Sequence, residues 1–110
     1  MCTQRDAIRI MHEAKAFCNE LFPIKEAYLY GSYARGDFHP ESDIDILITA
    51  DIPLEDISKY RREIAVITSE LSLENDVTVS VTVKPDEQFR RFSEAMPFYK
   101  NVKAEGIRYA

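Results

Sequence analysis

The segment GSYARGDFHPESDID, residues 31–45, holds two of the chain's three glycines, Gly31 and Gly36. The run 27–30, Ala-Tyr-Leu-Tyr, precedes it, and the β-branched run 45–49, Asp-Ile-Leu-Ile-Thr, ends it. Both runs have the composition of strands. A glycine at the end of a strand lets the backbone turn sharply and approach a ligand without an intervening Cβ. The segment therefore predicts two strands joined by a loop whose two ends carry its chemistry.

The first end is the pair Gly31-Ser32. If a helical turn begins at Ser32, its free N–H groups point outward and favour an anion such as phosphate. Arg35 lies one turn further on and would add positive charge. The same residues are also consistent with a plain turn glycine followed by a helix N-cap, so the pair alone does not define a site.

The second end is the sequence Asp43-Ile44-Asp45. Strand side chains alternate between faces, so Asp43 and Asp45 would share one face, about 6–7 Å apart, and leave the isoleucines on the other. Two carboxylates this close repel each other unless a cation lies between them. Their oxygen atoms suit Mg²⁺ or Mn²⁺. A solvated strand end that carries two acids would show the same pattern.

Working outward, helical spacing of apolar residues predicts a helix over 3–21, with Thr3 as N-cap, and a second helix over 53–73. Alternating valines predict a strand over 76–83. A short helix over 86–93 follows, and further helical turns run from Met96 to near Gly106. The expected fold is a single α/β domain over residues 1–110, with a small mixed sheet of about three strands and helices packed on one face.

Composition narrows the class of protein. The chain has 14 Lys and Arg against 19 Asp and Glu, a net charge of −5, which argues against a broad nucleic-acid surface. No apolar run approaches the ~20 residues of a membrane span. The first residues have no basic region followed by an apolar stretch, so we expect a cytoplasmic protein in which Cys2 and Cys18 are reduced thiols.

Taken together, the two ends of the segment resemble the signature of the DNA polymerase β-like nucleotidyltransferase superfamily. Gly-Ser-Tyr-Ala-Arg-Gly with Ser-Asp-Ile-Asp-Ile-Leu-Ile is similar to its minimal nucleotidyltransferase branch, as is the closing stretch 97–107. The resemblance implies that Gly31 and Ser32 bind the triphosphate, with Arg35 in support. It also implies that Asp43 and Asp45 are the catalytic metal ligands.

The resemblance further implies an activity. Such proteins bind ATP or another NTP with Mg²⁺ or Mn²⁺ and transfer a nucleoside monophosphate to an acceptor hydroxyl, releasing pyrophosphate. Minimal members commonly act as antitoxins that place AMP on a tyrosine of a small helical HEPN toxin. We therefore expect AMP transfer from ATP, and a HEPN-like partner protein.

The sequence departs from the family pattern at the third acid, which usually lies inside the third strand. Ser80, within Val79-Ser80-Val81, stands where that acid is expected. Asp76 is on the same predicted face, but four residues away, about 13 Å along a strand. An alternative function therefore stays open, in which a catalytically weakened module binds a nucleotide or a partner and neutralises the partner by occlusion. Phe98 and Tyr99 are candidates for such an interface, and packing in the core is the alternative role for both.

Overall fold

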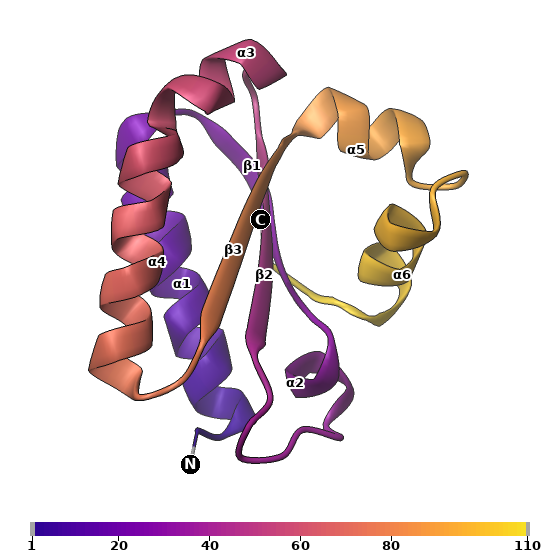
Figure 1. The fold of residues 1–110 in the computed structure, drawn as a ribbon. Helices are drawn as coiled ribbons and strands as arrows, with labels where there is room; N and C mark the ends of the chain where they lie inside the picture. The colour runs from indigo at the N-terminus through magenta and orange to yellow at the C-terminus, as the bar shows by residue number, and fades with distance from the viewer. Residues whose placement is uncertain (1, 110) are drawn as a thin grey trace.

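The computed structural model describes residues 2–109, which form a four-stranded sheet with helices on both sides (Figure 1). The order across the sheet is β3-β2-β1-β4. Strand β2 runs antiparallel to β1 and parallel to β3, and β4 is antiparallel to β1. The strands are β1 Ile24–Tyr30, β2 Ile44–Ala50, β3 Val79–Pro85 and β4 Ile107–Tyr109.

The helices fall into two groups around this sheet (Figure 1). They are α1 Gln4–Leu21, α2 Ser32–Arg35, α3 Leu54–Ile57, the 3₁₀ helix η1 Ser58–Tyr60, α4 Arg61–Asn75, α5 Asp86–Phe92 and α6 Pro97–Glu105. Helices α1 and α4 lie against one side, and α5 and α6 lie on the other. No helix within residues 2–109 combines the length and apolarity that a membrane span requires.

Helix α1 begins as its sequence predicts. The Thr3 N–H donates to Asp6 Oδ2 at 2.9 Å, and the Asp6 N–H donates to Thr3 Oγ1 at 3.1 Å. This capping box satisfies two donors that the first helical turn would otherwise leave free. The predicted core residue Cys18 is fully buried on the same helix.

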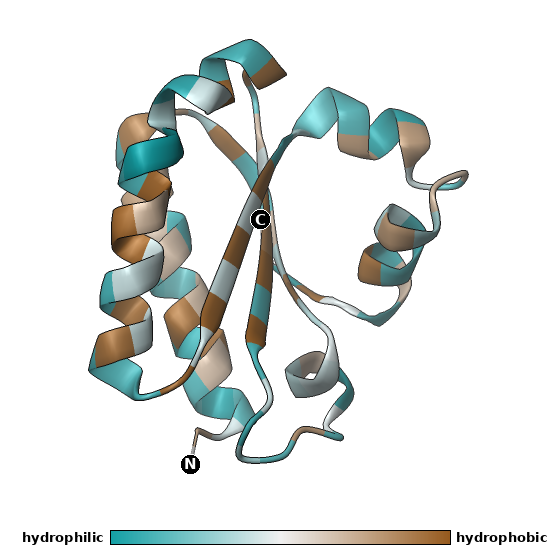
Figure 2. Cartoon of the chain, in the orientation of Figure 1, coloured by the Kyte–Doolittle hydropathy of each residue, from teal (hydrophilic) through white to brown (hydrophobic). Residues whose placement is uncertain are grey.

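The two faces of β2 are covered differently. Ile44, Ile46 and Ile48 are fully buried in the core formed with α1 and α4. On the opposite face, Leu47 packs in a smaller cluster with aromatic and aliphatic residues of β1, α5 and α6: Tyr28, Phe89, Tyr99 and Val102. Figure 2 shows apolar and polar residues alternating along the neighbouring strand β3.

The mixed α/β fold is confirmed, with corrections. Strand β4 adds a fourth strand to the three that were predicted. Helices α5 and α6 cover part of the second face, so the prediction that helices pack on one face only was incomplete. The predicted helix 53–73 is divided into α3, η1 and α4. The predicted strand 76–83 begins only at Val79, because Asp76 adopts a left-handed conformation, φ +50°, and ends α4.

Candidate functional site

Gly31 joins β1 to α2 in a conformation that only glycine adopts without strain, with φ +77°. A Cβ built at this position would lie 2.6 Å from Asp45 Oδ2, well inside contact distance. The carboxylate of Asp45 therefore lies directly against the backbone of the turn. The structure brings together two residues that the sequence separates by fourteen positions, as their proposed joint role requires.

Helix α2 is a single short turn that starts at this glycine. The N–H groups of Ala34 and Arg35 both donate to the Gly31 carbonyl at 3.1 Å. The N–H groups of Ser32 and Tyr33 have no backbone partner within residues 2–109, as expected for the first residues of a helix. Ser32 is partly exposed whereas Tyr33 is fully buried, so only the Ser32 N–H is open to an anion.

Contacts with α1 and with the loop after α2 hold the turn in place. Gln4 of α1 donates its side-chain amide to the carbonyls of Tyr33, at 2.9 Å, and Ala34, at 3.3 Å. The Tyr33 ring is fully buried and stacks on Phe38 with ring centroids 4.2 Å apart. These contacts fix the orientation of α2 relative to the sheet and so keep its free N–H groups in place.

Asp45 lies between Tyr30 of β1 and Ser80 of β3, its two partners in the strand register. Its side chain is half-buried and forms no hydrogen bond or salt bridge within residues 2–109. Burial raises the pKa of the Asp45 carboxyl, and the negative charge of Asp43 raises it further, while Arg35 acts in the opposite direction. The site thus holds a half-buried carboxylate that Arg35 compensates only in part.

Asp43 is exposed and lies one residue before β2, which begins at Ile44. The predicted strand 45–49 therefore begins one residue earlier than expected and leaves Asp43 just outside it. Its charge nevertheless contributes to the raised pKa of Asp45, which places the two carboxylates within electrostatic range of each other.

Ser80 pairs with Asp45 across β2 and β3, so the structure has a hydroxyl beside Asp45 where the sequence resemblance led us to expect an acid. Asp76 cannot substitute, because it lies outside β3. Within residues 2–109 no group of three or more His, Cys, Asp or Glu could hold a metal ion. A Mg²⁺ ion commonly uses one or two carboxylates and completes its shell with water and substrate phosphates. Asp43 and Asp45 fit that pattern, but not an all-protein metal site.

Arg35 is held by two acids that sequence reasoning did not associate with it. Its Nε donates to Asp37 Oδ2 at 3.2 Å, and its Nη1 donates to Glu105 Oε2 at 3.4 Å. Glu105 ends α6, 70 residues away in the chain. Such a long-range pair has no local sequence signal, so only the fold reveals it.

A cavity of about 200 Å³ lies between α2 and α6, and we call it the α6 cavity. Its lining residues are Tyr30, Gly31, Arg35, Phe98, Asn101, Val102 and Glu105. Burial raises the pKa of the Tyr30 hydroxyl, the charge of Asp45 raises it further, and a hydrogen bond with Thr82 lowers it. Of the two aromatic residues suggested for an interface, Phe98 is 41% exposed, whereas Tyr99 is buried.

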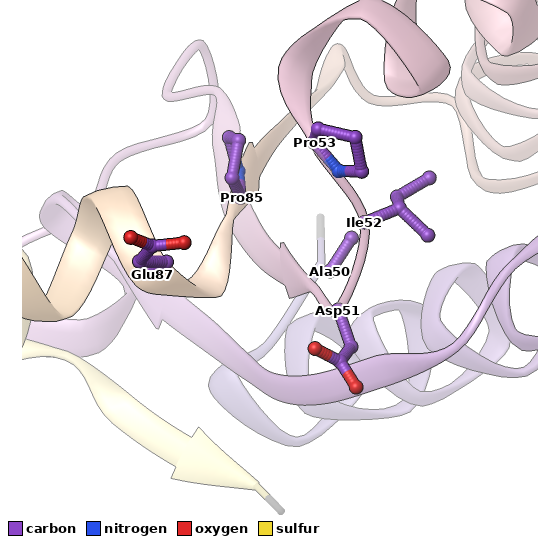
Figure 3. A pocket seen from close by; sticks show the side chains of 6 residues that line it. All are labelled: Ala50, Asp51, Ile52, Pro53, Pro85 and Glu87. Atoms are coloured by element: carbon purple, nitrogen blue, oxygen red, sulfur yellow. The ribbon is translucent and has the colours of Figure 1, made fainter.

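A different hollow, of about 190 Å³, lies at the other end of β2 (Figure 3). It is lined by Ala50, Asp51, Ile52, Pro53, Pro85 and Glu87. The Oδ2 atom of Asp51 lies 4.0 Å from the Nζ atom of Lys25, and the Asp51 side chain is largely exposed. Its charge is therefore balanced by a nearby cation and hydrated by solvent. This end lacks a glycine turn and a half-buried carboxylate, which makes it a weaker candidate site.

The chain belongs to the nucleotidyltransferase domain family, whose match covers residues 11–108. The predicted resemblance to nucleotidyltransferases is thereby confirmed. Two curated relatives from Methanocaldococcus jannaschii carry the name "Putative protein adenylyltransferase". MJ0604 is 36% identical over 83 residues, 76% of this chain and 75% of the relative. MJ0141 is 36% identical over 78 residues, 68% of this chain and 76% of the relative.

Solved structures show the same fold. A chain from "the toxin-antitoxin with AMP-PNP" superposes with a TM-score of 0.58 at 21% identity, covering 97% of this chain and 72% of that one. A chain from a mutant "toxin-antitoxin MntA-HpeT" superposes with a TM-score of 0.55 at 19% identity, covering 100% and 73%.

Proposed function

We propose that this nucleotidyltransferase transfers AMP from ATP to an acceptor hydroxyl. A bond forms between the acceptor oxygen and the α-phosphorus, the bond from that phosphorus to the bridging oxygen breaks, pyrophosphate leaves, and the hydroxyl proton passes to solvent. The observation that carries the proposal is the contact between the Asp45 carboxylate and the Gly31 backbone. It joins a metal-binding group to a phosphate-binding turn.

Each residue of the site has a distinct proposed role. The free N–H group of the partly exposed Ser32 would bind a phosphate oxygen, and Gly31 would let the triphosphate approach it. Arg35 would give only weak support at the rim, because its guanidinium is already paired with Asp37 and Glu105. Asp43 and Asp45 would hold Mg²⁺ or Mn²⁺. The ion would neutralise phosphate charge and favour attack by the acceptor oxygen.

The proposed acceptor is a tyrosine hydroxyl of a small helical, HEPN-like partner protein in the cytoplasm. Two observations support a protein acceptor. The curated relatives are named as protein adenylyltransferases, and the chains of similar fold come from toxin-antitoxin structures.

A second candidate function is an antitoxin module that binds its partner and neutralises it by occlusion. The hydroxyl of Ser80 beside Asp45 favours this alternative, because a neutral oxygen is a weaker metal ligand than a carboxylate. In that case Asp43 and Asp45 would still bind a nucleotide-bound metal, but transfer would be slow or absent.

The two functions differ in label transfer. We would incubate the purified chain with α-³²P-labelled ATP, Mg²⁺ and the protein encoded by the neighbouring gene, and measure label on that protein. AMP transfer predicts label that is lost in Asp43→Ala and Asp45→Ala and is retained in the control Asp51→Ala. Complex formation without label, unaffected by Asp43→Ala or Asp45→Ala, would favour occlusion instead.

A further inference from the structure

The α6 cavity begins where the proposed phosphate site ends. Gly31 touches the Asp45 carboxylate and also lines the cavity. A ligand whose phosphates bind at the Gly31 turn would therefore have the cavity directly beside it. Its volume of about 200 Å³ is that of a subsite for one part of a ligand rather than for a whole drug-sized molecule.

The charges around the cavity favour an uncharged group. Among the described residues that line it, Arg35 alone is cationic, and it is already paired with Asp37 and with Glu105. Because two carboxylates face one guanidinium, the cavity has no surplus positive charge for another phosphate. An aromatic ring with polar edges is better suited to it.

The walls of the cavity provide contacts for such a ring. Tyr30 and Phe98 meet edge to face with ring centroids 5.5 Å apart, and Phe98 is 41% exposed. Buried Val102 adds an apolar surface. Aromatic and aliphatic side chains of this kind favour stacking and apolar contact with a planar base.

Asn101 supplies the polar group. Asn101 is an exposed residue that lines the cavity, and its side-chain amide forms no hydrogen bond within residues 2–109. A carboxamide offers one acceptor and two donors on a planar edge. This arrangement matches the adenine edge, where an asparagine can accept from the N6 amino group and donate to N7. Guanine presents two acceptors on the same edge and gives a poorer match.

We propose that the α6 cavity binds the adenine ring of ATP, with Asn101 selecting it through the N6 and N7 edge. The inference rests on the proposed function, because it takes the triphosphate to bind at the Gly31 turn. It adds a base-reading residue that lies on α6, remote in sequence from the glycine and the aspartates. It also accounts for the aromatic rings of Tyr30 and Phe98 and the neutral amide of Asn101 in one cavity.

The test separates the base from the phosphates. Calorimetric titration of the full chain with ATP, GTP and inorganic tripolyphosphate, each with Mg²⁺, would be compared for wild type, Asn101→Ala and Lys100→Ala. Lys100 is exposed on α6 and does not line the cavity, so Lys100→Ala is the matched control. Alanine is a good helix former, so Asn101→Ala should leave α6 intact.

We expect wild type to bind ATP more tightly than GTP. Asn101→Ala should lose about ten-fold in ATP affinity and most of the preference over GTP, while tripolyphosphate affinity stays unchanged. An unchanged ATP affinity in Asn101→Ala would overturn the inference. This includes the outcome in which Asn101→Ala lowers only the rate of AMP transfer, because the cavity would then hold the acceptor rather than adenine. An equal loss of tripolyphosphate affinity would also overturn it. Wild-type protein that binds none of the three ligands would instead overturn the proposed function.

Discussion

Adjacent residues of β2 lie on opposite faces of the strand and differ in how fully they are buried. Ile46 is fully buried against α1 and α4, whereas its neighbour Asp45 is half-buried on the other face without a hydrogen bond or salt bridge in residues 2–109. On that second face the cover of α5 and α6 reaches Leu47 and Tyr28. The candidate site is therefore the part of the sheet where the cover is incomplete.

This difference separates the residues of β2 that stabilise the fold from the one that we assign to ligand binding. Every isoleucine of β2 gains stability from burial, because apolar side chains removed from water favour folding. Asp45 has no such gain, since burial and the charge of Asp43 both disfavour its ionised form. A carboxylate kept in that environment is better explained by a ligand than by folding.

The largest expected effect comes from changing one residue on each face. Ile46→Ala should lower the free energy of unfolding by about 2–5 kcal/mol, since it leaves a cavity in the core. Asp45→Asn should not destabilise the fold and should raise its melting temperature, because it removes a poorly compensated charge. Urea denaturation and thermal melts would measure both variants. An Asp45→Asn protein as unstable as Ile46→Ala would mean that the two faces do not differ as described.

The next effect compares two glycines with positive φ. Gly31→Ala should cost about 1–3 kcal/mol of stability and abolish nucleotide binding. The new Cβ would clash with Asp45 Oδ2, and the positive φ of residue 31 is unfavourable for alanine. In Gly36→Ala the φ of +89° causes strain, but nothing lies within 4 Å of the Cβ. Gly36→Ala should therefore cost about 1–2 kcal/mol and retain binding. Equal loss of binding in the two variants would show that contact with Asp45 is unimportant.

The smallest effect concerns the missing acid. Ser80→Asp should raise Mg²⁺ affinity on the order of ten-fold, because it adds a carboxylate beside Asp45. Without Mg²⁺ the same variant should melt at a lower temperature than wild type, since like charges are brought together. Ser80→Asn, similar in size but uncharged, is the control. A Ser80→Asp protein whose melting temperature does not respond to Mg²⁺ would exclude this position as a metal ligand.

Local sequence signals predicted the elements that depend on neighbours in the chain. The capping residues Thr3 and Asp6 define the start of α1, and the alternating valines define most of β3. The left-handed conformation of Asp76 has no reliable signal, because an aspartate can adopt it or avoid it. Strand β4 is only three residues long and exists because β1 offers a free edge, which periodicity cannot reveal.

The candidate site was predicted to a similar extent. Gly31 and Asp45 follow from residue type and spacing, and the structure brings them into contact. The pairing of Arg35 with Glu105 and the position of Asn101 depend on how α6 packs over the sheet. Packing between distant segments is a tertiary property, so these residues could be identified only from the fold.

The central claim is that the Gly31 turn and the Asp43–Asp45 pair form one binding site for a metal-bound triphosphate. Its most direct test is calorimetric titration of Mg²⁺-ATP into wild type, Asp45→Asn and Asp51→Asn, the last carrying the same change at the opposite end of β2. We predict binding to wild type and Asp51→Asn and no measurable binding to Asp45→Asn. Binding to Asp45→Asn with wild-type affinity would contradict the claim.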